Sequence, residues 1–160
     1  MATRAVNVHA LLERVAELLQ VERPEIAIVR DYDPSLPAWH GDPDRALQAL
    51  LNLVRNAAEA EARRVVLRSR AEAGWRDERG QRVPALRIEV EDDGKGVPVA
   101  IASTLFEPMV SGRPDGTGLG LALAREIARE HGGELTYTPR EAGSCFVIRL
   151  PRHPRTGESG

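Results

Sequence analysis

Apolar residues recur at helical spacing in three segments of the chain. The predicted helices lie at residues 6–23, 41–62 and 119–131. Asn7 is a suitable N-cap for the first helix. The second has Asp42 at its N-cap and Pro43 at its first helical position, where the missing N–H of proline leaves no hydrogen bond unmade. These starts predict helices that begin at defined residues.

Segments that are rich in β-branched residues or alternate in polarity predict strands. They lie at residues 25–32, 63–70, 85–98 (where the strand runs into a glycine turn), 133–139 and 144–151. A polar stretch at 71–83 predicts a hairpin loop, and residues 140–143 a turn. Residues 99–108 predict one helical turn, and 109–118 a mobile loop. The order α-β-α-β-β-α-β-β predicts an α+β fold with a mixed sheet covered by helices on one face.

The composition excludes several classes of protein. The chain has 160 residues, a net charge of −2 and no basic stripe with interleaved aromatic residues, so no nucleic-acid partner is expected. Its one lysine, Lys95, is not part of a GxxxxGK[ST] motif, which excludes a P-loop. Its one cysteine, Cys145, excludes an intramolecular disulfide. Without a signal peptide or a membrane-spanning apolar run, a cytoplasmic location and no membrane partner are expected.

Three glycines, Gly116, Gly118 and Gly120, stand at alternate positions where the third helix begins. Glycine destabilises helix interiors by about 0.5–1 kcal/mol relative to alanine, so three glycines at the start of a helix need an explanation. The first N–H groups of a helix have no intrahelical partner and lie at the positive end of its dipole. The pattern predicts either a phosphate-binding helix start or a loop that merely caps the helix.

A second pair of glycines follows a predicted strand in EDDGKGVP, residues 91–98. Asp92 can accept a hydrogen bond from an exocyclic amine, while Gly94 and Gly96 leave room for a flat ring beside the chain. The alternative is an ordinary Asp-Gly turn. A calcium-binding loop is excluded by counting, because its twelfth position falls on Ala100, where a glutamate is required.

Two asparagines, Asn52 and Asn56, lie four residues apart and therefore on one face of the second helix. Asparagine is a mediocre helix former, so a pair at this spacing needs an explanation. Amide oxygens are hard ligands, suited to Mg²⁺ that is held mainly by phosphates and water. The alternative is a pair of solvated or capping asparagines.

Four segments occur in the order and approximate spacing of the N, G1, F and G2 boxes of one protein family. They are NLVRNAAEA at 52–60, DDGKGVP at 92–98, LFEPMVSG at 105–112 and GTGLGLALAREIAREHGG at 116–133. Over roughly residues 5–151, the chain resembles the ATP-binding catalytic domain of sensor histidine kinases, in the superfamily of gyrase, Hsp90 and MutL. It is most similar to the nitrogen-regulation kinases of the NtrB type. The resemblance implies a Bergerat (GHKL) fold, a two-layer α/β sandwich, over residues 1–151, and a disordered tail at 152–160.

The resemblance also implies that the chain binds ATP and Mg²⁺. Asp92 is expected to hold the adenine amino group, with Gly94 and Gly96 beside the ring. Asn56 is expected to ligate Mg²⁺, and Asn52 to lie near the phosphates one turn earlier. Ser144 matches a hydroxyl often found near the adenine in this superfamily.

By the same resemblance, residues 111–118 form an ATP lid. Cofactor-binding positions there and at the start of the third helix are Gly116, Thr117, Gly118, Leu119 and Gly120. The N–H groups of the last three are expected to meet the phosphates. Phe106 is expected to anchor the lid, although a buried core phenylalanine is an equally natural interpretation. Arg113 is a candidate cation for the terminal phosphates, or a solvated loop arginine, and joins Asn52 and Asn56 in the expected catalytic set.

Two departures from the family pattern bear on the reaction. In the ATP-hydrolysing branch, a glutamate stands four residues before the magnesium-binding asparagine and activates water. Asn52 stands there in this chain, and an amide cannot take up a proton at neutral pH, which favours phosphoryl transfer over hydrolysis. Many histidine kinases also carry a lysine and an aromatic residue three and four positions after that asparagine. Glu59 and Ala60 replace them, so the contacts of that lysine are not expected.

None of the four histidines stands in the H-E-[ILF]-[KR]-N-P setting of a phosphoacceptor. His131 is interpreted as structural, because a helix C-terminus favours a cation, and His9 as a surface residue of the first helix. The γ-phosphate is therefore expected to go to a histidine on a separate helical hairpin of the parent kinase. An NtrC-like response regulator and a PII signal protein are the further expected partners, and nitrogen regulation is the expected process.

Three other functions stay open at this point. A stand-alone serine kinase of the anti-sigma-factor type would yield an acid-stable phosphoprotein. A nucleotide-gated interaction module would bind ATP without transferring phosphate. A GHKL-type ATPase would turn over ATP by itself.

Overall fold

The main sheet has five strands in the order β2-β4-β5-β7-β6, as described by a computed structural model of residues 1–107 and 120–153. Strand β2 runs parallel to β4, and all other neighbours are antiparallel. The strands are β2 (Ala27–Asp31), β4 (Arg64–Arg76), β5 (Arg82–Asp92), β6 (Glu134–Pro139) and β7 (Ser144–Pro151). The mixed sheet that the sequence predicts is confirmed.

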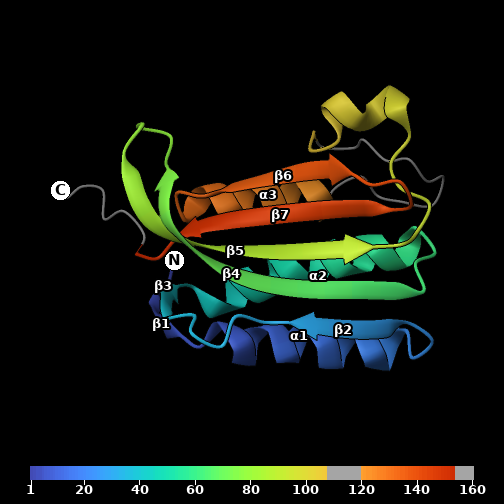
Figure 1. The fold of residues 1–160 in the computed structure, drawn as a ribbon, viewed down its shortest axis with the longest axis horizontal. Coiled ribbons are helices and arrows are strands. Elements are labelled where there is room, and N and C mark those ends of the chain that lie inside the picture. The colour runs from blue at the N-terminus through green and yellow to red at the C-terminus, as the bar shows by residue number, and fades with distance from the viewer. Residues whose placement is uncertain (108–119, 154–160) are drawn as a thin grey trace.

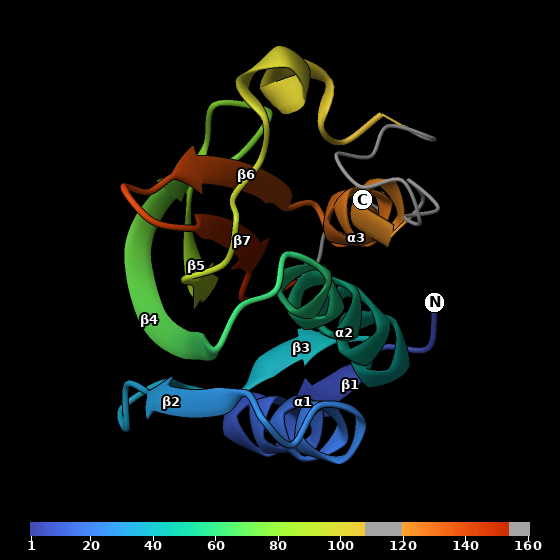
Figure 2. The same cartoon turned by 90° about the vertical axis from the view of Figure 1, so that its right-hand side faces the viewer.

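The α-helices in the described part of the chain lie on one face of the sheet, as Figures 1 and 2 show. They are α1 (Val8–Glu22), α2 (Pro43–Glu59) and α3 (Gly120–Glu130). The short 3₁₀ helix η1 (Val99–Thr104) lies beyond the β6 edge of the sheet. This arrangement confirms the α+β two-layer sandwich. Within residues 1–107 and 120–153, none of the helices has the length and hydrophobicity needed to cross a lipid bilayer.

Two helices begin at the residues that the sequence predicts. The Asn7 side chain accepts hydrogen bonds from the N–H groups of the second and third residues of α1, and the Asp42 side chain does the same for α2. Helix α2 ends at Glu59, three residues before the predicted end. The reason is Glu61, whose φ of 63° is left-handed and incompatible with a continuing α-helix.

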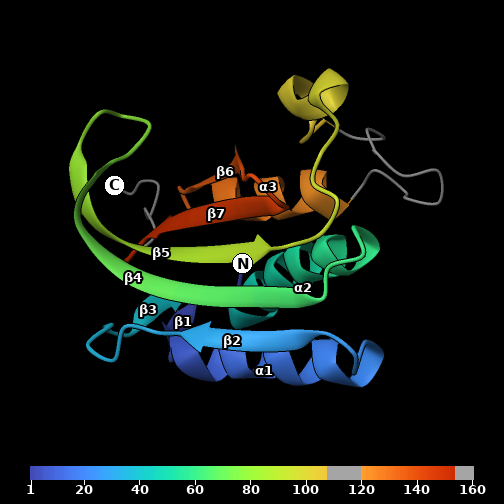
Figure 3. The same cartoon turned by 45° about the vertical axis from the view of Figure 1, so that its right-hand side comes forward.

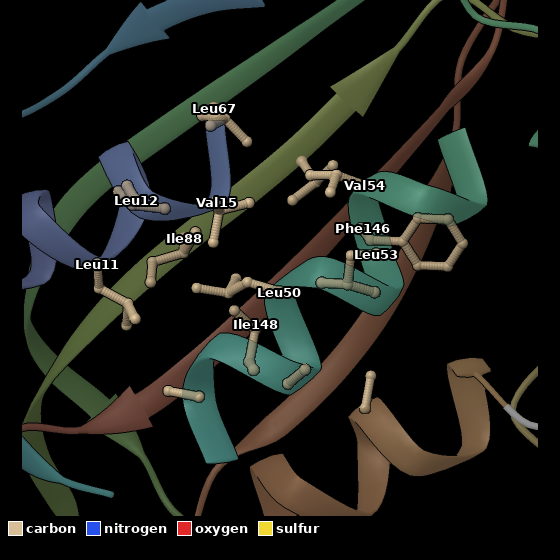
Figure 4. Packing of buried hydrophobic residues seen from close by; sticks show 14 of the residues in the cluster. Leu11, Leu12, Val15, Leu50, Leu53, Val54, Leu67, Ile88, Phe146 and Ile148 are labelled. Carbon is tan, nitrogen blue, oxygen red and sulfur yellow. The ribbon is translucent and has the colours of Figure 1, made fainter. Parts of the chain in front are cut away.

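The hydrophobic core fills the space between the helices and the sheet (Figure 4). Strands β5 and β7 direct alternate side chains toward the helices, so that Ile88, Phe146 and Ile148 are buried against α2. Helix α2 contributes Leu50 and Leu53, both at most 2% exposed. This packing holds β5 and β7 in fixed positions beside α2.

The β4–β5 hairpin is longer than the sequence predicts. Most of the loop predicted at residues 71–83 is strand: β4 continues to Arg76 and β5 starts at Arg82, with Trp75 opposite Val83. The hydrogen-bond ladder continues, across a register shift, through residues of which none is buried, so no buried apolar face marks this part of the strands. As Figures 1 and 3 show, this hairpin projects past the other strands and curls away.

A second, two-stranded sheet joins β1 (Arg4–Val6) to β3 (Trp39–Gly41) and was not predicted. Both strands have only three residues, too few for a periodic pattern to be visible in the sequence. Trp39 in β3 is 1% exposed, and its Nε1–H donates to the carbonyl oxygen of Pro151 at 3.1 Å. This contact fastens β3 to the end of the main sheet.

The face of the sheet that the α-helices do not cover carries charged side chains that pair across the strands. Arg68 lies 3.0 Å from the Asp31 carboxylate and 2.8 Å from that of Glu89. Hydrogen bonds to Asp31 and other carboxylates raise the pKa of Arg68. Further cross-strand pairs are Arg70–Asp31, Arg87–Glu72, Arg149–Glu72 and Arg149–Glu134. These charged side chains, which alternate along the strands with the buried ones, thus find their ion-pair partners within the domain.

Candidate nucleotide-binding site

The site-forming segments that lie within the described residues meet at one end of the sheet. Strand β5 ends there at Asp92 and β7 begins there at Ser144. The C-terminal half of α2 and the start of α3 lie at the same end, on the right in Figure 1. Motifs that are far apart along the chain therefore become neighbours because two strands and two helices terminate together.

Asp92 and Ser144 are directly opposite each other in the β5–β7 ladder. Opposite residues of an antiparallel pair project from the same face, and Asp92 continues the alternation of Ile88 and Val90 toward the helices. Both side chains are 2% exposed. The register thus brings together two of the predicted adenine-binding residues, one a carboxylate and the other a hydroxyl.

The two neighbouring aspartates of the glycine turn have different surroundings. Asp92 Oδ1 accepts the Gly94 N–H at 2.8 Å. The exposed Asp93 accepts the N–H groups of Arg63 and Arg64 at 2.9 and 3.0 Å, which ties the turn to the start of β4. Burial opposes ionisation of Asp93, but these hydrogen bonds outweigh it and lower its pKa. Asp93 is a structural residue, whereas Asp92 lies on the covered face.

The glycines of this turn are required by the protein's own backbone. A Cβ on Gly94 would lie 2.5 Å from the Ala60 carbonyl oxygen, which also accepts the Lys95 N–H at 2.8 Å. Gly96 has a φ of 76°, and its Cβ would lie 3.3 Å from the Gly143 carbonyl oxygen. The structure therefore supplies a reason for both glycines besides the predicted approach of a flat ring, which stays a prediction.

Asn52 connects α2 to the first residue of α3. Its Nδ2 donates to the Gly120 carbonyl oxygen at 3.2 Å, and a Cβ on Gly120 would lie 3.9 Å from Asn52 Cβ. Asn56, one turn later, is half-buried. Asn52 thus lies beside the helix start at which the sequence predicts phosphate binding, and Asn56 lies one turn further along α2.

Phe106 packs against the core. Its ring meets Phe146 edge-on at a centroid distance of 6.1 Å, and the Arg125 guanidinium carbon lies 5.7 Å from its centroid. Phe106 is half-buried and packs at the edge of the core instead of being fully buried within it, and its predicted role as lid anchor stays a prediction. The predicted cofactor and catalytic positions outside the described residues are Arg113, Gly116, Thr117, Gly118 and Leu119. The predicted mobile loop at 109–118 and all but the first two residues of the predicted tail also lie outside them.

His131 and His9 both pack against other residues of the domain. His131 is 1% exposed; its Nδ1 donates to the Ile127 carbonyl and its Nε2 accepts the Asp42 N–H. Both ring nitrogens of His131 are thus engaged within the protein, in agreement with the predicted structural role. His9 is half-buried, stacks on Tyr32 at 5.0 Å and lies 3.1 Å from Ser69 Oγ, so it is more enclosed than the predicted surface position.

No group of three or more histidine, cysteine or carboxylate side chains that could hold a metal occurs among residues 1–107 and 120–153. A complete metal cage of that kind is thus absent from this part of the chain. The predicted metal ligand is one amide oxygen, that of Asn56. A single hard oxygen ligand fits Mg²⁺, which is usually bound through one or two protein oxygens plus substrate phosphates and water.

The fold and this cluster of residues define a nucleotide-binding α+β domain. A sequence profile of the histidine kinase-, DNA gyrase B-, and HSP90-like ATPases matches residues 41–154. The chain is 44% identical over 150 residues to the sensory histidine kinase/phosphatase NtrB of Escherichia coli O157:H7, covering 91% of this chain and 43% of NtrB. The chain belongs to the histidine kinase-, DNA gyrase B-, and HSP90-like ATPase family, and spans less than half the length of the curated relatives that it matches.

Solved structures agree with this assignment. The catalytic domain of the histidine kinase ThkA, in a nucleotide-free form, superimposes with a TM-score of 0.79 at 27% identity, covering 96% of this chain and 98% of that one. ThkA in complex with the response regulator TrrA gives a TM-score of 0.76 at 25% identity, covering 95% of this chain and 42% of that one. The resemblance inferred from the four boxes is confirmed.

Proposed function

We propose that this chain is the ATP- and Mg²⁺-binding catalytic domain of a two-component sensor histidine kinase that acts in nitrogen regulation. In this role it donates the γ-phosphate of ATP to a histidine on a helical hairpin outside the chain. The observation that carries the proposal is the convergence of the N, G1 and G2 boxes at one end of the sheet, where Asn52 contacts Gly120 and Asp92 pairs with Ser144. The 44% identity to NtrB supports the process.

Each side chain of the cluster has a distinct task in this proposal. The Asp92 carboxylate accepts a hydrogen bond from the adenine amino group, and the Ser144 hydroxyl lies beside the ring. The Asn56 amide oxygen holds Mg²⁺, which neutralises phosphate charge when it is bound. Backbone N–H groups at the start of α3, around Gly120, receive the phosphate oxygens, because they have no intrahelical partner and lie at the positive end of the dipole.

Transfer is favoured over hydrolysis by the chemistry of Asn52. A water molecule needs a base to attack the γ-phosphorus efficiently, and an amide cannot accept its proton. The Asn52 amide nitrogen is also engaged with the Gly120 carbonyl. An imidazole nitrogen from a partner is itself a nucleophile, so it needs no base on this domain. It forms the new P–N bond while the bond from the γ-phosphorus to the leaving ADP oxygen breaks.

The proposed partners follow from the same comparison. The phosphoacceptor hairpin belongs to the parent kinase, since the curated relatives are more than twice as long as the matched region. An NtrC-like response regulator would then take the phosphate from the histidine, and a PII protein would regulate the kinase. The ThkA complex with TrrA supports a response regulator as the class of partner.

The test is a phosphotransfer assay with the chain, ATP labelled at the γ-position, Mg²⁺ and the helical hairpin of a nitrogen-regulation kinase. We expect label on the hairpin that is lost in acid, because phosphohistidine is acid-labile. Asn56→Ala should abolish the transfer. Asn7→Ala, the same substitution at the N-cap of α1, should leave it intact.

Other outcomes would point to the other functions. Acid-stable label on a partner protein would favour a serine kinase. ATP binding without any transfer would favour an interaction module, and rapid release of phosphate by the chain alone would favour an ATPase. Each of these three results would contradict the proposal.

A further inference from the structure

The turn between β6 and β7, residues 140–143, is fastened to the end of β5 by one arginine. Arg140 Nη1 donates to the Asp92 carbonyl oxygen at 2.7 Å and to the Ala142 carbonyl oxygen at 2.9 Å. Its Nη2 lies 3.5 Å from the Glu91 carboxylate. The guanidinium therefore bridges the backbone of the turn and the last residue of the strand.

The turn itself leaves no room for Asp92 to move toward it. Gly143 has a φ of 96°, and a Cβ there would lie 1.9 Å from the Asp92 carbonyl oxygen. On its other side, Gly143 approaches Gly96, whose Cβ would lie 3.3 Å from the Gly143 carbonyl oxygen. The Asp92 backbone is thus held by close packing against Gly143 and by the hydrogen bond from Arg140.

Arg140 differs from Arg87 and Arg149 on the uncovered face of the sheet. Arg87 and Arg149 pair with carboxylates, whereas the shortest hydrogen bond of Arg140 goes to the backbone of Asp92. Asp92 is the final residue of β5, and the β5–β7 ladder ends at its pairing with Ser144. Arg140 Nη1, which donates to two carbonyl oxygens at once, adds a further constraint at this end of the ladder.

We propose that Arg140 is a positioning residue for adenine recognition. By holding the Asp92 backbone, it fixes the direction in which the Asp92 carboxylate meets the 6-amino group of the purine. The inference rests on the proposed function, since it concerns the same carboxylate. Arg140 itself touches only protein, and its effect on the nucleotide is exerted through Asp92.

The test compares two nucleotides that differ in one group. ATP and purine riboside triphosphate, which has hydrogen in place of the 6-amino group, are titrated with Mg²⁺ into the wild-type chain and into Arg140→Ala in a calorimeter. We expect Arg140→Ala to weaken ATP binding about tenfold, the size of effect expected for a misaligned hydrogen bond to a charged group. Binding of the analogue should change less than about twofold. Arg140→Lys, which can still donate to the Asp92 carbonyl, should fall between wild type and Arg140→Ala for ATP.

Arg149→Ala is the matched control, because Arg149 also pairs with carboxylates on this face but contacts neither Asp92 nor the turn. It should leave the binding of both nucleotides unchanged. Equal weakening of both nucleotides by Arg140→Ala, or no weakening of either, would overturn the inference. A wild-type chain that does not distinguish the two nucleotides, or that binds neither, would instead contradict the role proposed for Asp92.

Discussion

The substitution Gly94→Ala tests whether Gly94 is required by packing against the Ala60 carbonyl or by the approach of the adenine ring. In Gly94→Ala, the new methyl would lie 2.5 Å from the Ala60 carbonyl oxygen and 2.9 Å from Ala60 Cβ. Carbon–oxygen contacts are comfortable near about 3.3 Å, so the turn has to retreat by roughly 1 Å. That movement stretches the 2.8 Å hydrogen bond from the Lys95 N–H to the same carbonyl. Overpacking costs about 1–3 kcal/mol and the lost hydrogen bond about 0.5–1.5 kcal/mol.

Urea unfolding of the nucleotide-free chain measures this cost. We expect Gly94→Ala to lower the free energy of unfolding by about 2–4 kcal/mol. Gly74→Ala is the control: its methyl would meet the flexible end of Arg82 at 3.1 Å, so the stability should change by less than about 0.5 kcal/mol. If Gly94→Ala unfolds like wild type without nucleotide and loses only ATP affinity, the glycine serves the ring and the backbone argument is refuted.

Three further predictions concern stability. Glu61→Gly should raise the free energy of unfolding by about 0.5–1 kcal/mol in urea, because glycine removes the strain of a φ of 63°; lower stability would contradict this reasoning. His131→Phe keeps a ring beside Trp39 but leaves the Asp42 N–H unpaired, so urea unfolding should show a loss of about 1–3 kcal/mol. Burial opposes ionisation of Asp42, but backbone N–H groups outweigh it and lower its pKa, so its contribution is complete above about pH 4 and is lost as the pH falls further. Asp42→Asn should therefore lose less stability than wild type between about pH 4 and pH 2.

Local chemistry was sufficient to predict the starts of α1 and α2 and the order of the elements other than β1 and β3. Asn7 and Asp42 cap their helices through their own side chains, so the signal lies within a few residues. The carboxylate that we propose for adenine recognition was also chosen locally, from an aspartate at the end of a strand and before a glycine turn. Such features need no knowledge of distant contacts, which is why the sequence predicts them.

The features that the sequence does not predict depend on partners far along the chain. The β4–β5 hairpin continues through residues that are not buried because each strand completes the ladder of the other. The role of Gly94 depends on the Ala60 carbonyl at the end of α2. Arg140 stands in an ordinary turn, and only the fold brings its guanidinium to the Asp92 carbonyl. A non-local hydrogen bond of this kind has no local pattern.

The most direct test of the account is a crystal structure of this chain with a non-hydrolysable ATP analogue and Mg²⁺. The account predicts the purine amino group within about 3.2 Å of an Asp92 carboxylate oxygen. It also predicts Mg²⁺ on the Asn56 amide oxygen and the phosphates at the N-terminus of α3. A nucleotide bound at another place, or a purine whose amino group points away from Asp92, would contradict it.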